Sequence, residues 1–123
     1  MKITKEDKVF SEYIRLRAGY KCERCGVLHE RGVGLHCSHY MGRMNQATRF
    51  EEDNGDSLCY GCHSYFEERK QTEYRDWKIR KLGKKRVEEI EQMSRGIKKW
   101  KVDEKELIIN KYKLWISNKK NKT

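Results

Sequence analysis

The sequence predicts an α+β domain built around a four-cysteine zinc site, with a helix before it and a basic helical extension after it. Three observations lead to this fold class. Two cysteine pairs enclose a short, glycine-containing segment typical of β structure, and helical patterns occupy both ends of the chain. In addition, only 36% of the 123 residues are hydrophobic while 39% are charged, which favours a metal as a substitute for a large apolar core.

The chain contains no obvious linker. Proline is absent and the nine glycines are scattered, so we expect a zinc-stabilised domain over residues 1–95 and a basic amphipathic helical tail over residues 96–123. No run approaches the roughly 18 apolar residues that a membrane span needs, and the first ten residues lack the apolar segment of a signal peptide. We therefore expect a cytoplasmic protein with no membrane partner.

Local signals predict the elements before and between the cysteine pairs. Thr4 and Asp7 have the spacing of a helix cap and Gly19 follows an apolar stripe, so the first helix covers about residues 5–18. Residues 26–40 are short and broken by glycines, which favours a β-hairpin. Residues 41–58 are expected to form an ordered loop, with a turn at Asn54–Gly55 and a helix entry at Asp56 or Ser57.

The second half of the chain is expected to be helical. One helix is predicted over about residues 59–82, with Gly83 as its stop, and another over about residues 84–95. The tail helix has an apolar face that must pack either on the domain or on a second copy of the protein, as a homodimer. The members of this face are Leu107, Ile108, Tyr112, Trp115 and Ile116.

The cysteine spacing is typical of a structural zinc site. Cys22 and Cys25 form one CxxC pair, and Cys59 and Cys62 form a second, 33 residues further on. Two such pairs can surround one tetrahedral Zn²⁺ with four thiolates, and this closed shell leaves no position for a substrate. The fifth cysteine, Cys37, is expected to be a buried free thiol and not a ligand.

A second set of residues, which a closed zinc site does not need, suggests catalysis. His39, Asn54 and His63 would lie at the end of a strand, in the following loop and in the first turn of a helix, which is a ββα-metal arrangement. His63 and Glu67 are four residues apart, so they share a helix face and together suit a divalent cation.

These residue types suit the hydrolysis of a phosphodiester. The reaction needs a base for the attacking water, and a histidine with a pKa near 6.5 can act as one, so we assign this role to His39. It also needs a cation beside the leaving oxygen, which we assign to His63 and Glu67. Asn54 would fix the loop that orients the imidazole, and Arg43 and Arg49 could clamp phosphate oxygens.

Charge is distributed unevenly along the chain. Residues 1–77 carry 13 basic and 13 acidic side chains, whereas residues 78–123 carry 16 basic and 6 acidic ones. Such an excess predicts a polyanionic partner, most simply nucleic acid bound through its phosphates, although a solvated lysine-rich helix has the same composition. The basic residues that begin the helix at about residues 84–95 are further candidates for phosphate contacts: Lys84, Lys85 and Arg86.

Several of these motifs together resemble the HNH nucleases with paired CxxC motifs, and more narrowly the phage NinG/Rap recombination nucleases. They include the two cysteine pairs, Ser38-His39-Tyr40, Arg43, Arg49-Phe50, Asn54, Tyr74-Arg75 and the segment Val87-Glu88-Glu89-Ile90-Glu91. The resemblance implies a ββα-metal (HNH) core over residues 1–95 with structural Zn²⁺ and catalytic Mg²⁺ or Mn²⁺. It also implies cleavage of branched or recombination DNA intermediates in a phage-infected or prophage-bearing bacterial host.

The chain departs from many HNH enzymes at one position. These enzymes place Asp or His, as a metal ligand, immediately before the base, whereas this chain has Ser38 there. The serine hydroxyl, His36 or water could take that ligand position. Two other function classes stay open: a non-catalytic zinc module that binds nucleic acid through residues 78–123, and a protein-interaction module that uses the apolar face of the tail.

Overall fold

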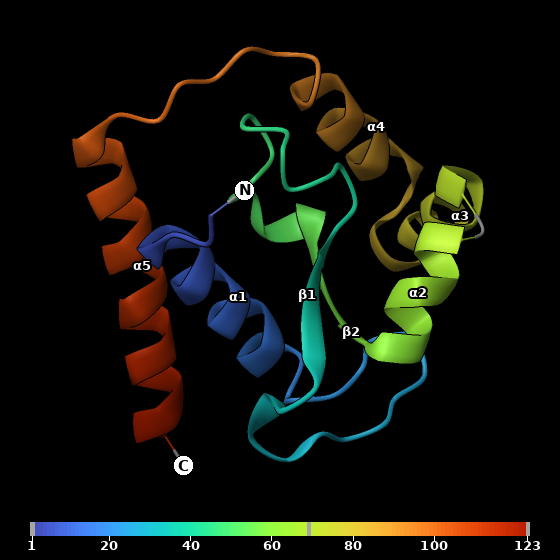
Figure 1. Cartoon of the computed structure of the whole chain (residues 1–123), viewed down its shortest axis with the longest axis horizontal. Helices are drawn as coiled ribbons and strands as arrows, with labels where there is room; N and C mark the ends of the chain where they lie inside the picture. The colour runs from blue at the N-terminus through green and yellow to red at the C-terminus, as the bar shows by residue number, and fades with distance from the viewer. Residues whose placement is uncertain (1, 69, 123) are drawn as a thin grey trace.

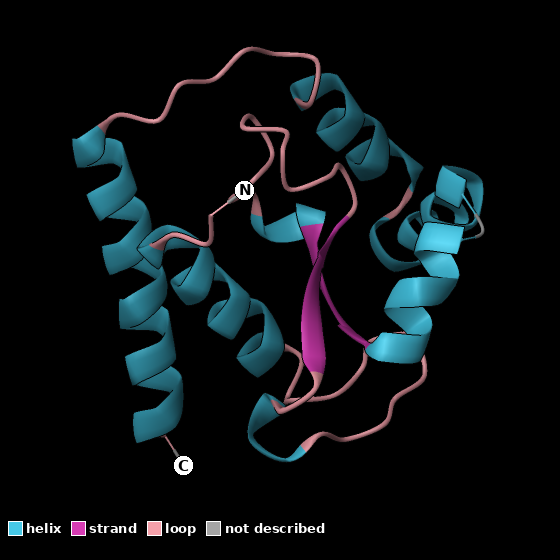
Figure 2. Ribbon diagram, viewed as in Figure 1, coloured by secondary structure: helices cyan, strands magenta, loops and turns pink. Residues whose placement is uncertain are grey.

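The computed structural model describes residues 2–68 and 70–122, with two central strands between two groups of helices (Figures 1 and 2). Helices α1 and α5 lie on one side of the strands, and α2, α3 and α4 lie on the other. The mixed α+β class predicted from the sequence is therefore confirmed. The elements are α1 (Lys5–Arg17), β1 (Leu35–His39), β2 (Gly55–Cys59), α2 (Tyr60–Glu68), α3 (Lys70–Leu82), α4 (Lys84–Met93) and α5 (Val102–Asn121), with short 3₁₀ turns at Glu30–Gly32 and Glu52–Asn54.

The two strands pair antiparallel across a long loop. Leu35 lies opposite Cys59 and His39 opposite Gly55, so residues 40–54 connect the strands. The expected hairpin within residues 26–40 is therefore wrong, and so is the helix entry at Asp56 or Ser57. Arg31 and three glycines of this segment, Gly26, Gly32 and Gly34, have positive φ angles, which bend the chain away from extended structure.

Helix boundaries follow the local signals closely. At the start of α1, Thr4 Oγ1 accepts a hydrogen bond from the Asp7 N–H at 3.2 Å, while Asp7 Oδ2 accepts one from the Thr4 N–H at 2.9 Å. Gly83, with φ +88°, precedes α4. Residues 59–82, expected as one helix, instead hold the last residue of β2 and two helices, α2 and α3.

Strand β2 is held against α3 by buried charges. Asp56 and Lys78 are both 0% exposed, and Lys78 Nζ lies 3.0 and 3.1 Å from the two carboxylate oxygens of Asp56. The Tyr74 hydroxyl donates to Asp56 Oδ2 at 2.7 Å, and Lys81 Nζ also donates to Asp56 at 2.6 Å. These partners offset the free-energy cost of burying the Asp56 carboxylate in the strand.

Apolar side chains form two clusters, one on each side of the strands. The first joins β1, β2, α2, α3 and α4 through residues such as Leu58, Phe66 and Ile90. The second joins α1 to α5 through Phe10, Tyr13, Ile14, Phe50 and Tyr112. None of the helices in the described residues is long and apolar enough to cross a membrane.

The tail helix packs on its own domain. The Tyr112 hydroxyl donates to the Phe50 carbonyl at 2.8 Å, and the rings of Tyr112 and Tyr13 are 4.5 Å apart. Of the five residues predicted to form the apolar face of the tail, Leu107 is the exception, since it is 67% exposed. The other four belong to the second cluster: Ile108, Tyr112, Trp115 and Ile116.

Candidate nuclease and zinc site

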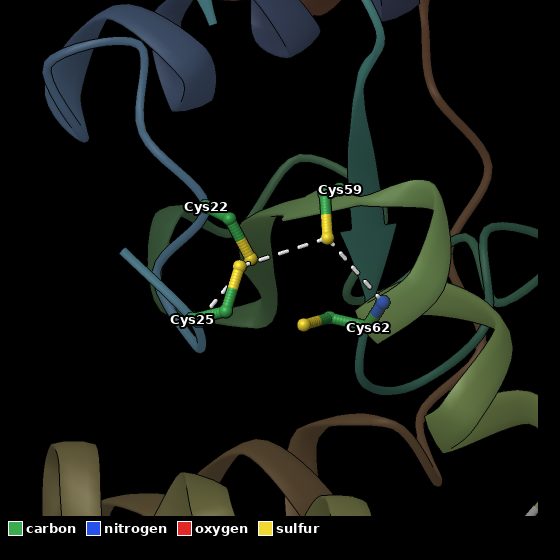
Figure 3. A group of neighbouring side chains, drawn as sticks. All are labelled: Cys22, Cys25, Cys59 and Cys62. Atoms are coloured by element: carbon green, nitrogen blue, oxygen red, sulfur yellow. Dashed lines mark hydrogen bonds between the residues drawn. The ribbon is translucent and has the colours of Figure 1, made fainter. Parts of the chain in front are cut away.

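Four cysteine sulfurs converge on one point (Figure 3). Cys22 and Cys25 lie in the turn after α1, Cys59 ends β2, and Cys62 lies in the first turn of α2. All four Sγ atoms are within 4.8 Å of one another, and those of Cys25 and Cys59 are 3.8 Å apart. A tetrahedral ion with metal–sulfur bonds of about 2.3 Å requires sulfur separations of about 3.8 Å. The cluster therefore fits a structural Zn²⁺.

The surroundings of the cysteines shift their pKa values in different directions. Burial raises the pKa of Cys22, but hydrogen bonds from backbone N–H groups outweigh it and lower this pKa to about 6. Burial raises the pKa of Cys62 to about 12, although Arg24 Nη1 donates a hydrogen bond to its sulfur at 3.5 Å. A bound cation would stabilise all four thiolates and displace their protons.

His39 ends β1 with its two ring nitrogens in different surroundings. Its Nε2 lies 3.0 Å from the backbone carbonyl oxygen of Arg49. A carbonyl only accepts hydrogen bonds, so Nε2 must carry the proton, and the neutral ring keeps its lone pair on Nδ1. Burial lowers the pKa of His39, which favours this neutral form. The arrangement suits a general base.

Asn54 fixes the loop on which His39 depends. Its side chain is 0% exposed and bridges the loop in both directions. Oδ1 accepts from the Met41 N–H at 2.8 Å, and Nδ2 donates to the carbonyls of Met41 and Thr48 at 3.0 and 3.1 Å. The residue therefore holds the two ends of the loop 40–54 together, next to the carbonyl that orients His39.

His63 and Glu67 lie together on α2. His63 Nε2 is 3.2 Å from Glu67 Oε1, while His63 Nδ1 is buried without a hydrogen-bond partner among the described residues. A divalent cation could replace the direct contact between Nε2 and the 68% exposed carboxylate of Glu67, with these two groups as its ligands. Two protein ligands fall short of a closed shell, so water or substrate oxygens would complete the coordination of Mg²⁺.

Ser38 and His36 are the two side chains considered for the metal-ligand position that precedes the base in many HNH enzymes. The Ser38 hydroxyl is buried and lies 2.9 Å from the Tyr74 hydroxyl, with which it forms a hydrogen bond. The His36 ring stacks on His63 with centroids 5.1 Å apart and planes at 8°, so the two rings do not point at a common ion. In the described residues, the four cysteines form the one group of three or more His, Cys, Asp or Glu donors close enough to share a metal.

A cleft of about 420 Å³ brings these histidines together with basic side chains. His36, His39 and His63 line it, and so do Lys8, Arg15 and Arg43. A smaller hollow of about 260 Å³ is also lined by His39, His63 and Glu67. The predicted residues His39 and His63 therefore line the same two hollows.

The predicted phosphate contacts divide into two groups. Arg43 lines the cleft, but Arg49 is buried and pairs with Asp7, donating from Nε at 2.9 Å and from Nη2 at 2.5 Å. Arg49 therefore fastens the loop to α1, and contact with a phosphate would require this pair to open. On α4, Lys84 and Lys85 are exposed, whereas Arg86 pairs with Asp53 and Glu51, each at 2.7 Å.

Three cleft residues of α1 were absent from the sequence prediction: Lys8, Ser11 and Arg15. Their spacing places them on one helix face beside the apolar stripe, and this is the signal that could have identified them. Cys37 also lines the cleft, outside the cysteine cluster, and burial raises the pKa of its thiol to about 12. It is therefore a thiol at neutral pH.

Comparison with known proteins gives one match. Neither the curated proteins nor the solved structures matched the chain. A family model described as Bacteriophage Lambda NinG protein matches residues 2–122, which is nearly the whole chain. On this evidence the chain belongs to the NinG family of phage proteins.

Proposed function

We propose that this protein is a metal-dependent DNA endonuclease of the HNH (ββα-metal) kind. One observation carries the proposal: a neutral imidazole, oriented by a backbone carbonyl, shares a cationic cleft with a second imidazole that has a carboxylate beside it. The first is His39 and the second is His63, next to Glu67. Phosphodiester hydrolysis needs a base and a site for a cation in one cavity, and these residues supply both.

The chemistry of the protein residues follows from their positions. Nδ1 of His39 takes a proton from a water molecule while the water oxygen forms a bond to phosphorus. The bond from phosphorus to the leaving oxygen then breaks, and this oxygen takes a proton from a second water molecule, which yields a phosphate monoester and an alcohol. The hydroxide left by the second water takes back the proton from His39. Arg43, which lines the same cleft, would neutralise charge on the phosphate oxygens.

His63 and Glu67 would hold the divalent cation. Mg²⁺ or Mn²⁺ at this site would supply positive charge beside the leaving oxygen. Asn54 acts on the reaction indirectly, because it holds the loop whose carbonyl at Arg49 orients His39. The zinc site has a separate role, since its closed shell of four sulfurs only joins α2, which carries His63, to β2, which pairs with the His39 strand.

The substrate class rests on the family. Membership of the NinG family suggests a role related to phage recombination, and so the proposed substrates are branched or recombination DNA intermediates. They would be met in the cytoplasm of a phage-infected or prophage-bearing bacterium.

Cleavage assays test the proposal. Purified protein is incubated with supercoiled plasmid and with a synthetic four-way junction, in Mg²⁺ and in Mn²⁺. We expect cutting by the wild type and its loss in His39→Ala. His29→Ala is the matched control, because His29 lies in the turn region before β1 and does not line the cleft. The proposal fails if neither substrate is cut or if His39→Ala cuts as well as the wild type.

The alternative is a non-catalytic zinc module that binds nucleic acid. It is favoured by one observation: in residues 2–68 and 70–122 the cysteine cluster is the one group with three or more close metal donors. This alternative predicts salt-sensitive DNA binding that survives both His39→Ala and His63→Ala, without metal-dependent cleavage. The same preparations therefore separate the two functions.

A further inference from the structure

We propose that helix α1 binds the phosphodiester backbone of the DNA strand in the cleft, through Lys8 and Arg15. This inference rests on the proposed function, because it assigns a substrate contact to the same cleft. It differs from the sequence prediction, which placed the basic contacts in the loop 40–54 and at the start of α4.

The geometry of α1 suits a row of contacts along one DNA strand. Lys8, Ser11 and Arg15 follow one another at spacings of three and four residues, so they form one stripe, and all three line the cleft. The opposite face of the helix is buried through Phe10 and Ile14. Seven residues of helix span about 10.5 Å, or roughly three nucleotide steps at an axial rise of about 3.4 Å per strand.

Charge in the cleft favours an anion. Asp7, the acidic residue that lines the cleft, accepts a hydrogen bond from Arg49, and its carboxylate lies 3.7 Å from the Arg43 guanidinium. Arg15 contacts Glu12 at 3.3 Å, but its Nη1 also donates to Ser11 Oγ at 2.5 Å, which holds the guanidinium along the stripe. Lys8 is exposed at the cleft. Phosphate oxygens are the ligands that such a row of lysine, hydroxyl and arginine recognises.

The α1 face is also coupled to the base. Asp7 on α1 holds the side chain of Arg49, and the carbonyl of the same Arg49 holds His39. A phosphate positioned on α1 is therefore positioned relative to the His39 ring. No comparable connection to His39 exists for Lys84 or Lys85 among the described contacts, since neither lines the cleft.

Binding measurements on Lys8 test the inference. A labelled duplex and a four-way junction of the same sequence are titrated with protein over a series of salt concentrations, with Ca²⁺ replacing Mg²⁺ so that the DNA stays intact. We expect Lys8→Gln to weaken binding about threefold to tenfold and to lower the salt slope by about 1, because one phosphate contact is lost. Lys8→Glu should bind more weakly still, and Lys8→Arg should bind like the wild type.

The matched control is Lys21→Gln, which removes one positive charge from an exposed position outside both the cleft and the basic segment 78–123. Its affinity should stay within about twofold of the wild type. Arg15→Gln should behave as Lys8→Gln, and Arg15→Lys should retain most of the affinity. Zinc content and thermal midpoint are measured for each variant, because Arg15 also contacts Ser11 and Glu12.

Each result is decisive. The inference is overturned if Lys8→Gln and Lys8→Glu keep the affinity and salt slope of the wild type, or if Lys21→Gln loses as much. If the wild type cuts no DNA but the Lys8 series still lowers affinity in the expected order, the nuclease proposal fails and the row of contacts on α1 stands. If cleavage occurs but Lys8 has no effect, the reverse holds.

Discussion

At the scale of single residues, the two nitrogens of His39 have separate roles. Nε2 is bound to the Arg49 carbonyl, which leaves Nδ1 to accept a proton. Burial is the main influence on this ring and lowers its pKa. The hydrogen bond to the Arg49 backbone and the charge of Asp7 raise this pKa, while the positive charges of Arg43 and Arg49 lower it. The base is therefore neutral at pH values where an ordinary histidine is partly protonated.

This shift predicts the pH dependence of cleavage. A base works only while it is unprotonated, so activity falls as the pH drops through the pKa of His39. Because that pKa lies below the ordinary 6.5, we expect the midpoint of the decline in rate to lie below pH 6.5. Single-turnover cleavage rates across neutral and acidic pH give the profile. An acid limb centred at or above 6.5 would contradict the role given to His39.

Both Arg43 and Arg49 were predicted to contact phosphate oxygens, but the structure gives the two residues different surroundings. The two lie six residues apart in the same loop, so local pattern gives no reason to rank them. The partner that removes Arg49 from the cleft is Asp7, which is 42 residues away in the chain. The Asn54 side chain contacts backbone groups at Met41 and Thr48, which lie 13 and 6 residues earlier in the chain, so its contacts also depend on how the loop folds back.

At the scale of elements, local signals predicted the helices better than the strands. The cap at Thr4 and the stop at Gly83 fix helix ends through contacts a few residues away. Strand β2 carries no such signal, because Asp56 and Ser57 are typical of turns. They fit a buried strand only through distant partners, such as Lys78 for Asp56 and the Lys21 carbonyl for Ser57.

The buried pair of Lys78 and Asp56 predicts a large effect on stability. Lys78→Met leaves the Asp56 carboxylate buried with fewer partners, and the free energy of unfolding should fall by about 3 kcal/mol. Lys81 still contacts Asp56, which keeps the loss at the lower end of the range for broken buried pairs. Chemical denaturation measures the change.

Arg80→Met is the control for this variant, because it removes a cation from an exposed position of the same helix. Its effect should stay within about 0.5 kcal/mol. Equal losses for the two variants would mean that the buried pair does not fasten β2 to α3.

In the molecule as a whole, the strands lie between two apolar clusters, one built from the middle of the chain and the other joining its two end helices, α1 and α5. Tyr112 in the tail is 2% exposed and completes the cluster formed by α1. Tyr112→Ala should lower the free energy of unfolding by about 3 kcal/mol, since it opens a cavity and leaves the Phe50 carbonyl without its donor. Leu114→Ala, at a 64% exposed position of the same helix, should cost far less. Thermal denaturation of both variants decides whether the tail is part of the folded domain.

The other cluster contains the zinc site, and this site connects the fold to the proposed catalytic residues. Cys59 ends the strand that pairs with the His39 strand, and Cys62 begins the helix that carries His63. The CxxC spacing alone predicted this site, because its ligands need only local turns and one long-range meeting of the two pairs.

Removing zinc should therefore disrupt both stability and cleavage. Metal binding at such sites contributes on the order of 10 kcal/mol, which exceeds the total stability of many small domains. We expect one zinc per chain by elemental analysis, and we expect a chelator or Cys62→Ser to remove it together with the cooperative thermal transition and the DNA cleavage. Cys37→Ser should keep the metal, since Cys37 lies outside the cluster. If the metal-free protein melts and cuts DNA like the zinc-loaded one, the four cysteines do not hold His39 and His63 in position.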